Sequence, residues 1–356
     1  MSRFLADRFQ SLDKYVPGEQ PTGMDYIKLN TNESPYPPAP AVVAALTESE
    51  LGRVNLYPDP QGKALREKLA EFYGVSPDNI IIGNGSDEPL AFAFLAFCTD
   101  GRGAAFPDIT YGLYSVYSKL YEIKADVIPL RDDFTIDVSD YIGCGKNVII
   151  ANPNAPTGIA LPLSDIESIV ASNPDHVVLI DEAYVDFGAQ SCCKLIDKYP
   201  NLLVVMTYSK SRNMAGARLG FALANAELIA DLEKLKYAKN PYSVNSMTLR
   251  CAEAALSTGA QAYYENCHAK ICEVREYTTA ALQALGFSVL PSSANFIFAQ
   301  KAGLDGRALY EALKARGVLV RYFSQPRISD YNRITIGTME QMQTLVEAIT
   351  QIMGGR

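Results

Sequence analysis

The sequence has few of the residues that usually carry metal-dependent or histidine-based chemistry. It contains only two histidines, His176 and His268, and its seven cysteines form no C-x-x-C pair. This pattern indicates neither a zinc site nor a disulfide framework, and we expect no metal. If the chain is an enzyme, proton transfer is expected to fall to a side chain other than histidine.

Long apolar runs and blocks of basic residues are also missing. No run approaches the roughly 20 apolar residues that cross a bilayer, and the first residues, MSRFLADRFQSLDKY, have no long apolar core. We therefore expect a soluble, cytoplasmic protein without a secretory signal or transit peptide. The net charge of -8 argues against nucleic acids and membranes as partners. An anionic ligand would have to be held by a few well-placed arginines.

The sequence does contain an alternation of short β-branched runs and longer amphipathic stretches, which is typical of an α/β protein. Four runs are predicted as strands covered on both faces: 79–83, 147–151, 176–181 and 202–206. Each of them leads into a polar cluster, namely GNGSDE, NPNAPTG, DEAY and YSK. Ligands of open parallel sheets bind beyond the carboxyl ends of the strands, so we expect these clusters to meet at one site.

Length and pattern together predict an arm followed by two unequal domains. Residues 1–30 are predicted as an arm that packs on the small domain or on a partner subunit, residues 31–242 as the large domain, and residues 243–356 as a smaller α+β domain. The boundary is placed where Pro241 interrupts a helical pattern. The small domain is expected to begin with one long helix, over about 244–285.

Two of the polar clusters could bind charged groups. GNGSDEPL, residues 83–90, follows a strand and opens a helix, which presents free backbone amides to an anion such as phosphate. A structural turn capped by Ser86 or Asp87 would give the same pattern. Asp181 ends a buried strand, where a carboxylate is costly unless it meets a cation or a donor, although it could also be an ordinary helix cap.

The most informative segment is TYSKSRNMAGARLGF, residues 207–221. Its lysine, Lys210, lies between Ser209 and Ser211, and Arg218 follows eight residues later. Such a lysine could form a Schiff base next to a phosphate-binding arginine. A single lysine is more often a solvated surface residue, but together with the other three clusters in this order Lys210 is interpreted as catalytic.

In this order the motifs resemble those of the fold type I pyridoxal-phosphate-dependent aminotransferases and, among these, the histidinol-phosphate aminotransferase family. The resemblance covers essentially the whole chain. Further matching segments are LDKYVPG, LNTNESPYPP, NLYPDPQG, FPDITYGLY and NRITIGT. The resemblance implies a large domain with a mostly parallel central sheet flanked by helices, pyridoxal 5'-phosphate as cofactor, and a homodimer.

The resemblance also implies how the cofactor ring is held. Lys210 would anchor the cofactor and then move the proton between the substrate and the cofactor. Asp181 would pair with the ring nitrogen and keep it protonated. Tyr184 would hydrogen-bond the ring hydroxyl oxygen O3', and Tyr111 would stack on the ring face.

Two further groups of residues are implied for the anionic parts of the ligands. The cofactor phosphate would be bound by Ser86, Asp87, Ser209 and Arg218, and by Tyr57 of the neighbouring subunit. The substrate would be bound by Tyr15, Arg321 and Arg333, with the two arginines on its phosphate. Arg321 could equally be a surface residue at a strand edge.

The chain departs from the family pattern at one position. The family usually has asparagine directly before PTG, where its amide hydrogen-bonds O3', whereas this chain has Ala155. We expect Asn154 to contribute instead, with Tyr184 carrying most of the bond to O3'.

The implied reaction converts imidazole-acetol phosphate and L-glutamate to L-histidinol phosphate and 2-oxoglutarate, a step of histidine biosynthesis. A threonine-phosphate decarboxylase and an aromatic or general amino-acid aminotransferase remain alternatives, because they share the cofactor site. A non-catalytic regulator built on this fold is a third alternative. Such regulators usually carry a DNA-binding segment ahead of the fold, and here the motifs begin near residue 15, which argues against one.

Overall fold

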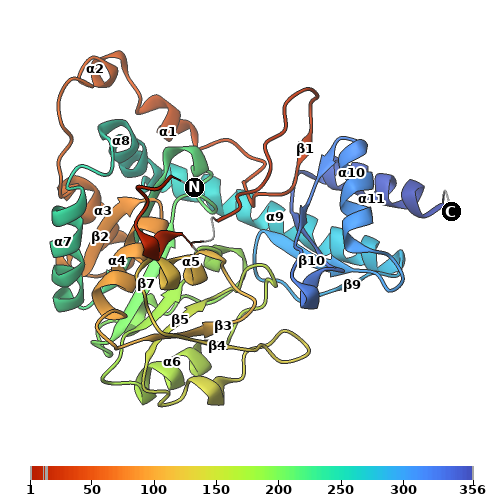
Figure 1. Cartoon of the computed structure of the whole chain (residues 1–356). Helices are drawn as coiled ribbons and strands as arrows, with labels where there is room; N and C mark the ends of the chain where they lie inside the picture. Colours follow the sequence, from red (N-terminus) through yellow and green to blue (C-terminus); the bar gives the residue numbers. More distant parts are fainter. Residues whose placement is uncertain (1, 11, 13–14, 355–356) are drawn as a thin grey trace.

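The computed structural model describes residues 2–10, 12 and 15–354. Figure 1 shows a large unit built on one sheet, a smaller unit with its own sheet, and the long helix α9 (Thr258–Ala284) running between them. Residues 13 and 14 of the LDKYVPG motif, and residues 1 and 11 of the predicted arm, lie outside the described residues. In the described part of the chain, no helix is long and apolar enough to span a membrane.

The large unit is organised around a seven-stranded sheet with the order β2-β8-β7-β6-β5-β3-β4. The strands are β2 (Ile80–Asn84), β3 (Ala104–Pro107), β4 (Ala125–Ile128), β5 (Asn147–Ala151), β6 (Val178–Asp181), β7 (Leu202–Thr207) and β8 (Leu219–Ala224). β8 runs antiparallel to both of its neighbours, and the other pairs are parallel. The predicted mostly parallel α/β sheet is therefore confirmed.

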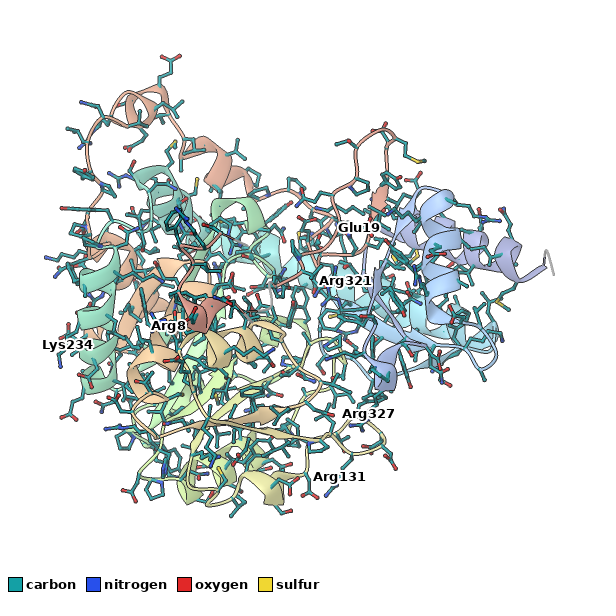
Figure 2. All side chains as sticks on the ribbon, in the orientation of Figure 1. Arg8, Glu19, Arg131, Lys234, Arg321 and Arg327 are labelled. Carbon is teal, nitrogen blue, oxygen red and sulfur yellow. The ribbon has the colours of Figure 1, made fainter. Side chains whose placement is uncertain are left out.

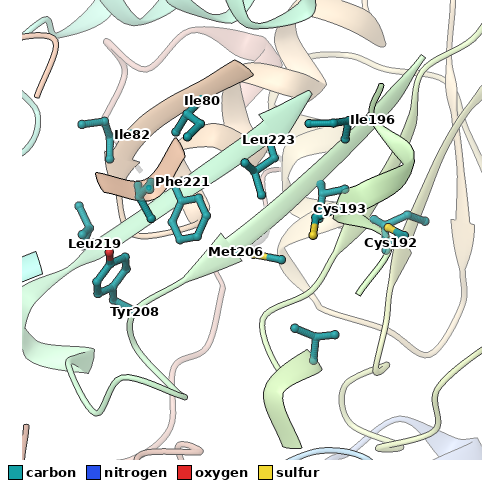
Figure 3. Packing of buried hydrophobic residues seen from close by; sticks show 14 of the residues in the cluster. Ile80, Ile82, Cys192, Cys193, Ile196, Met206, Tyr208, Leu219, Phe221 and Leu223 are labelled. Atoms are coloured by element: carbon teal, nitrogen blue, oxygen red, sulfur yellow. The ribbon is translucent and has the colours of Figure 1, made fainter. Parts of the chain in front are cut away.

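Helices cover both faces of this sheet because successive strand side chains point to opposite sides. One face packs α3 (Lys63–Tyr73), α6 (Leu163–Ser172) and α8 (Ser246–Ala255) against residues such as Ile80, Ile82 and Val204. Figure 3 shows part of this cluster, with Phe221 and Leu223 of β8 near Met206 of β7. The other face packs α4 (Asp87–Phe97), α5 (Leu113–Leu120) and α7 (Ala226–Lys239). Because both faces of the sheet are covered, these strands are buried along their length and read as continuous apolar runs.

The smaller unit contains a four-stranded antiparallel sheet with the order β12-β13-β10-β9. Its strands are β9 (Ser288–Val289), β10 (Phe296–Gln300), β12 (Arg321–Tyr322) and β13 (Asn332–Thr335), and α10 (Gly306–Ala315) and α11 (Met339–Gly354) pack on it. The arm joins this unit through β1 (Ile27–Lys28), which pairs in parallel with β11 (Val318–Leu319). The arm thus packs on the smaller unit through β1, and further upstream it contacts Arg321 of β12 through the carbonyls of Val16 and Pro17.

The single helix expected over 244–285 is in fact two helices, α8 and α9. The break falls at Leu256 and Ser257, where the Ser257 hydroxyl donates to the carbonyl of Ala254 and Ser257 becomes the N-cap of α9. Ala252 of α8 and Tyr264 of α9 pack in the cluster that covers the large sheet. The division of the chain at residues 242 and 243 stays a prediction, and we propose that the boundary lies further along, within α9.

The shorter elements link these parts. The large unit also carries α1 (Pro40–Ala44) and α2 (Glu48–Leu51). Single 3-10 turns lie at Asp7–Phe9, Pro77–Asn79, Val138–Tyr141, Val185–Phe187, Cys193–Leu195, Ala215–Ala217 and Pro326–Ile328. Between the units, Ile109 and Phe134 of the large unit pack with Phe298 and Ile328 of the smaller one. Figure 2 shows Arg327 beside Arg131 at this junction, where Arg327 donates to the Arg131 carbonyl.

Candidate active site

A cavity of about 670 Å³ lies between the large unit, the smaller unit and the arm. Its volume is within the range of small-molecule sites. All but two of the residues predicted for the site line it: Tyr15, Ser86, Asp87, Tyr111, Asp181, Tyr184, Ser209, Lys210, Arg218, Arg321 and Arg333. Side chains that are as much as 318 residues apart in sequence, from Tyr15 to Arg333, therefore face one space.

Asp181 is a buried carboxylate at the end of β6, with 4% of its surface exposed. It accepts a hydrogen bond of 2.9 Å from the Tyr114 hydroxyl and one of 3.2 Å from the Ala183 amide. Burial outweighs these two donors and raises the pKa of Asp181 to about 6. A cation placed in the cavity would stabilise the ionised carboxylate, so Asp181 is suited to hold a protonated ring nitrogen.

Lys210 follows β7 and is partly buried. Burial, together with the charges of Arg333 and Arg218, lowers the pKa of Lys210 to about 8, against the opposing effect of Glu33. Its Nζ donates to the Thr31 carbonyl at 3.2 Å. A lysine with this pKa is partly neutral near pH 8, so its amine can act as nucleophile and as proton acceptor.

One end of the cavity is built for an anion. Ser86 is the N-cap of α4 but its side chain makes no capping bond, which leaves its hydroxyl and the first amides of the helix available. Arg218 reaches this turn and forms an ion pair of 3.1 Å with Asp87. A Cβ on Gly85 would lie 2.5 Å from Nη2 of Arg218, and one on Gly220 only 2.2 Å from the Ser86 nitrogen. Both glycines are thus required for this close approach of arginine, turn and strand.

The aromatic wall of the cavity is fixed from several directions. The Tyr111 hydroxyl donates to Oδ1 of Asp87 at 2.9 Å. The Tyr111 ring lies edge-on to Tyr15, with 6.0 Å between ring centroids, and edge-on to Tyr114 at 5.7 Å. This fixed orientation suits a side chain that lies against a flat ligand ring.

The other end of the cavity carries two arginines that lie side by side on one face of the small sheet, because Arg321 of β12 pairs in register with Arg333 of the neighbouring strand β13. Arg333 donates through Nη2 to the Asn30 carbonyl at 3.0 Å, while its buried Nε has no hydrogen-bond partner in the described part of the chain. Arg321 is engaged differently: Nη1 and Nη2 donate to the carbonyls of Pro17 and Val16 at 2.9 and 2.7 Å. Figure 2 shows Arg321 beside this segment, below Glu19.

The structure does not bring two of the predicted residues into this cavity. Asn154 is buried and its amide is committed to its own loop, since Nδ2 donates to the Ile109 carbonyl at 2.9 Å and Oδ1 accepts from the Thr110 hydroxyl at 2.7 Å. Asn154 thus holds the loop in place, and a contribution of its amide to O3' stays a prediction. Tyr57 is 82% exposed and stacks on Tyr242, with 4.5 Å between ring centroids.

Three lining or supporting residues were missed from the sequence. Asn32 donates to the Tyr184 hydroxyl at 2.8 Å, Tyr114 supports Asp181, and Thr31 contacts Lys210. All three fall inside segments that carry the family resemblance, LNTNESPYPP and FPDITYGLY, but their side-chain or carbonyl directions depend on distant partners. Neither histidine lines the cavity, and His268 Nε2 lies 2.6 Å from the Ser211 carbonyl. No group of three or more metal-ligating side chains occurs among residues 2–10, 12 and 15–354.

The cavity therefore combines an amine, a buried carboxylate, a phenol, an aromatic wall and an anion cradle, as an aminotransferase requires. The chain belongs to the class I and II aminotransferase family, whose sequence model matches residues 24–349.

Several curated relatives within this family carry a more specific name. The histidinol-phosphate aminotransferase of Brachyspira hyodysenteriae is 48% identical over 354 residues, 99% of each chain. That of Marinomonas sp. is 51% identical and covers 98% of this chain and 99% of its own. Among solved structures, histidinol-phosphate aminotransferase from Sinorhizobium meliloti in complex with pyridoxal-5'-phosphate superposes with a TM-score of 0.86 over 99% of both chains. Because the two sequences are only 23% identical, this superposition shows the shared fold.

Proposed function

We propose that this chain is a pyridoxal-phosphate-dependent histidinol-phosphate aminotransferase. It would transfer the amino group of L-glutamate to imidazole-acetol phosphate and so form L-histidinol phosphate and 2-oxoglutarate. The observation that carries the proposal is the convergence of Lys210, Asp181, Tyr184 and Arg218 on one cavity whose opposite end holds a pair of arginines, Arg321 and Arg333. The names of relatives that are 44 to 51% identical over nearly the whole chain agree with it.

The residues present fit the cofactor. When bound, pyridoxal phosphate supplies an electron-accepting ring and carries the amino group between the two substrates. Asp181 would hold the ring nitrogen in its protonated form, because a buried carboxylate is stabilised by a cation. Tyr184 would donate to the ring hydroxyl oxygen, and Tyr111 would lie against the ring. Arg218, Ser209 and the Ser86 turn would bind the phosphate group.

Lys210 moves the proton. Its amine, with a pKa lowered to about 8, would accept the proton from the substrate carbon and then deliver it to the cofactor, and would move it the other way in the reverse half of the reaction. While the amine is free, the Thr31 carbonyl accepts one of its hydrogens and so limits the directions in which its lone pair can point. No histidine is needed for this step.

Arg333 is the residue we assign to the substrate phosphate. Its Nε is buried and without a partner among the described residues, and its guanidinium lies over Phe323 at 5.7 Å. An anionic group would satisfy this donor and offset the charge. Arg321 adds positive charge beside Arg333, but two of its N–H groups donate to the carbonyls of Pro17 and Val16 in the arm. Its larger contribution is therefore to hold this part of the arm, with Tyr15, at the cavity mouth.

We propose that the functional unit is a homodimer in which Tyr57 completes the phosphate site of the neighbouring subunit. The support is a run of exposed apolar side chains in the segment that leads to it: Val43, Leu51, Val54 and Leu56 are each between 48 and 63% exposed, and Tyr57 is 82% exposed. So many exposed apolar side chains in one short segment are typical of an interaction site. Tyr57 does not line the cavity of its own chain, which leaves it available to the cavity of a partner subunit.

The cellular setting is also a proposal. A biosynthetic aminotransferase with a net charge of -8 fits the cytoplasm, without nucleic acid or membrane as partner. Fractionation of the native protein would test the location.

A single-turnover spectrum tests the function. The chain loaded with pyridoxal phosphate is mixed with histidinol phosphate, threonine phosphate, phenylalanine or histidinol, and its visible absorption band is followed. We expect the band to be lost fastest with histidinol phosphate, and histidinol, which lacks the phosphate, serves as the matched control. Release of carbon dioxide from threonine phosphate would favour the decarboxylase instead, and an equal response to phenylalanine would favour a general aminotransferase.

A further inference from the structure

The phenol of Tyr184 has an unusual pair of neighbours. On one side the Asn32 amide donates to its oxygen at 2.8 Å, and Asn32 is only 1% exposed. On another side Ala155 packs against it in a small apolar cluster with Phe296, whose ring lies edge-on at 5.0 Å between centroids. A methyl and an aromatic edge cannot accept the phenol hydrogen, so the polar surroundings of this phenol are the Asn32 amide and the cavity.

The orientation of the Asn32 amide is fixed by its own hydrogen bonds. The Asn32 backbone amide donates to the Thr335 hydroxyl at 3.0 Å, and this hydroxyl donates to Oδ1 of Asn32 at 3.1 Å. Because Oδ1 is thus the acceptor, the NH₂ group is the end that meets Tyr184. The Asn32 carbonyl accepts from the Asn295 side chain at 3.0 Å. The residue also has a φ of 54°, in the left-handed region that asparagine tolerates better than most residues.

We infer that Asn32 is a positioning residue for Tyr184: by donating to the phenol oxygen, it directs the phenol's own hydrogen into the cavity, toward the cofactor hydroxyl oxygen. This inference rests on the proposed function. A hydroxyl that accepts one hydrogen bond is also a stronger donor of the next. Asn32 therefore acts on the cofactor through Tyr184.

The ionisation of Tyr184 agrees with this role. Burial raises the pKa of Tyr184, and the Arg333 charge and the Asn32 hydrogen bond offset only part of that effect. The phenol thus keeps its hydrogen near neutral pH and has one to donate.

Asn32 also lies in a segment that contacts two other active groups. The Asn30 carbonyl accepts from Arg333 and the Thr31 carbonyl accepts from Lys210. Three consecutive residues therefore touch the substrate arginine, the lysine and the phenol. Asn32 and its partners Thr335 and Asn295 belong to the smaller unit's side of the cavity, whereas Tyr184 follows β6 of the large sheet.

The test is a double-mutant cycle read by the pH midpoint of the visible cofactor band, which is independent of turnover. Asn32→Gly removes the amide and tolerates the positive φ. We expect it to raise the midpoint by about half a pH unit, since one neutral hydrogen bond corresponds to at most about one unit of pKa. Tyr184→Phe should raise the midpoint further, and Asn32→Gly should add nothing in the Tyr184→Phe background.

Two other variants keep the result decisive. Thr335→Ser retains the hydroxyl that orients Asn32, so its midpoint should equal that of wild type. If Asn32→Gly does not fold, Asn32→Asp can replace it, because aspartate retains the shape of the side chain and the oxygen that accepts from Thr335. Asn32→Asp should raise the pH midpoint of the cofactor band more in the wild-type background than in the Tyr184→Phe background.

An unchanged midpoint in Asn32→Gly, or a shift of the same size in the Tyr184→Phe background, would overturn the inference. A wild-type chain that forms no visible band with pyridoxal phosphate would instead refute the proposed function.

Discussion

The buried carboxylate of Asp181 predicts that Asp181→Asn stabilises the cofactor-free chain. Burial raises the pKa of Asp181 from an ordinary 3.8 to about 6. A shift of about two units means that ionised Asp181 destabilises the folded state by about 3 kcal/mol. The cost is close to its full size above pH 6 and disappears as the pH falls below 3.8, where the carboxyl becomes protonated in both states.

The same effect can be expressed as a melting temperature. For a chain of 356 residues the entropy of unfolding is about 0.75 kcal/mol per kelvin. The cofactor-free Asp181→Asn variant should therefore melt about 4 °C above wild type at pH 8 and at the same temperature near about pH 3, below both pKa values of the carboxyl. With saturating pyridoxal phosphate at pH 8 the order should reverse, because wild type gains the bond to the ring nitrogen and the variant does not.

Glu182→Gln is the matched control for this measurement. Glu182 is also buried, with a pKa raised to about 7 by burial, but it accepts from Ser191 and Cys192 and does not line the cavity. Added cofactor should stabilise this variant as much as it stabilises wild type. The reasoning would be refuted if cofactor-free Asp181→Asn melted below wild type at pH 8, or if added cofactor stabilised both equally.

Three other substitutions probe the remaining parts of the site. Lys210→Ala should still bind pyridoxal phosphate in equilibrium dialysis but lose about 10²- to 10⁴-fold or more in turnover, because proton transfer is lost; near-normal turnover would show that another lysine is catalytic. Arg333→Gln should raise the KM for histidinol phosphate by about 10-fold or more while leaving the reaction with histidinol unchanged, because one charge-assisted bond to phosphate is removed; an equal loss for both would argue against a phosphate contact. Tyr57→Phe should weaken cofactor binding by about tenfold without changing the dimer in sedimentation, and unaltered affinity would place Tyr57 outside the partner's site.

Most of the fold could be predicted from the sequence. The runs at 147–151 and 202–206 are buried on both faces, and this is why a short β-branched pattern was enough to predict β5 and β7. The break between α8 and α9 was missed because Leu256 and Ser257 carry no proline or glycine signal, and a side-chain bond to Ala254 ends the first helix.

Site residues could be predicted from the sequence where they directly follow strands of the large sheet. Lys210 and Asp181 were expected to lie together because parallel strands bring their carboxyl ends to one edge, and the family resemblance implied their roles. The hydrogen bonds of Asn154 and Asn32 could not be predicted, because their partners are Thr110, 44 residues away, and Thr335, 303 residues away. The roles of these residues toward cofactor and substrate stay predictions until they are measured.

The most direct test of the central claim is nitrogen transfer itself. The chain loaded with pyridoxal phosphate is incubated with ¹⁵N-labelled L-glutamate and imidazole-acetol phosphate, and the products are followed by NMR. We predict ¹⁵N-labelled histidinol phosphate and an equal amount of 2-oxoglutarate, with neither formed by Lys210→Ala. Absence of labelled histidinol phosphate from a chain that binds the cofactor would contradict the proposed function.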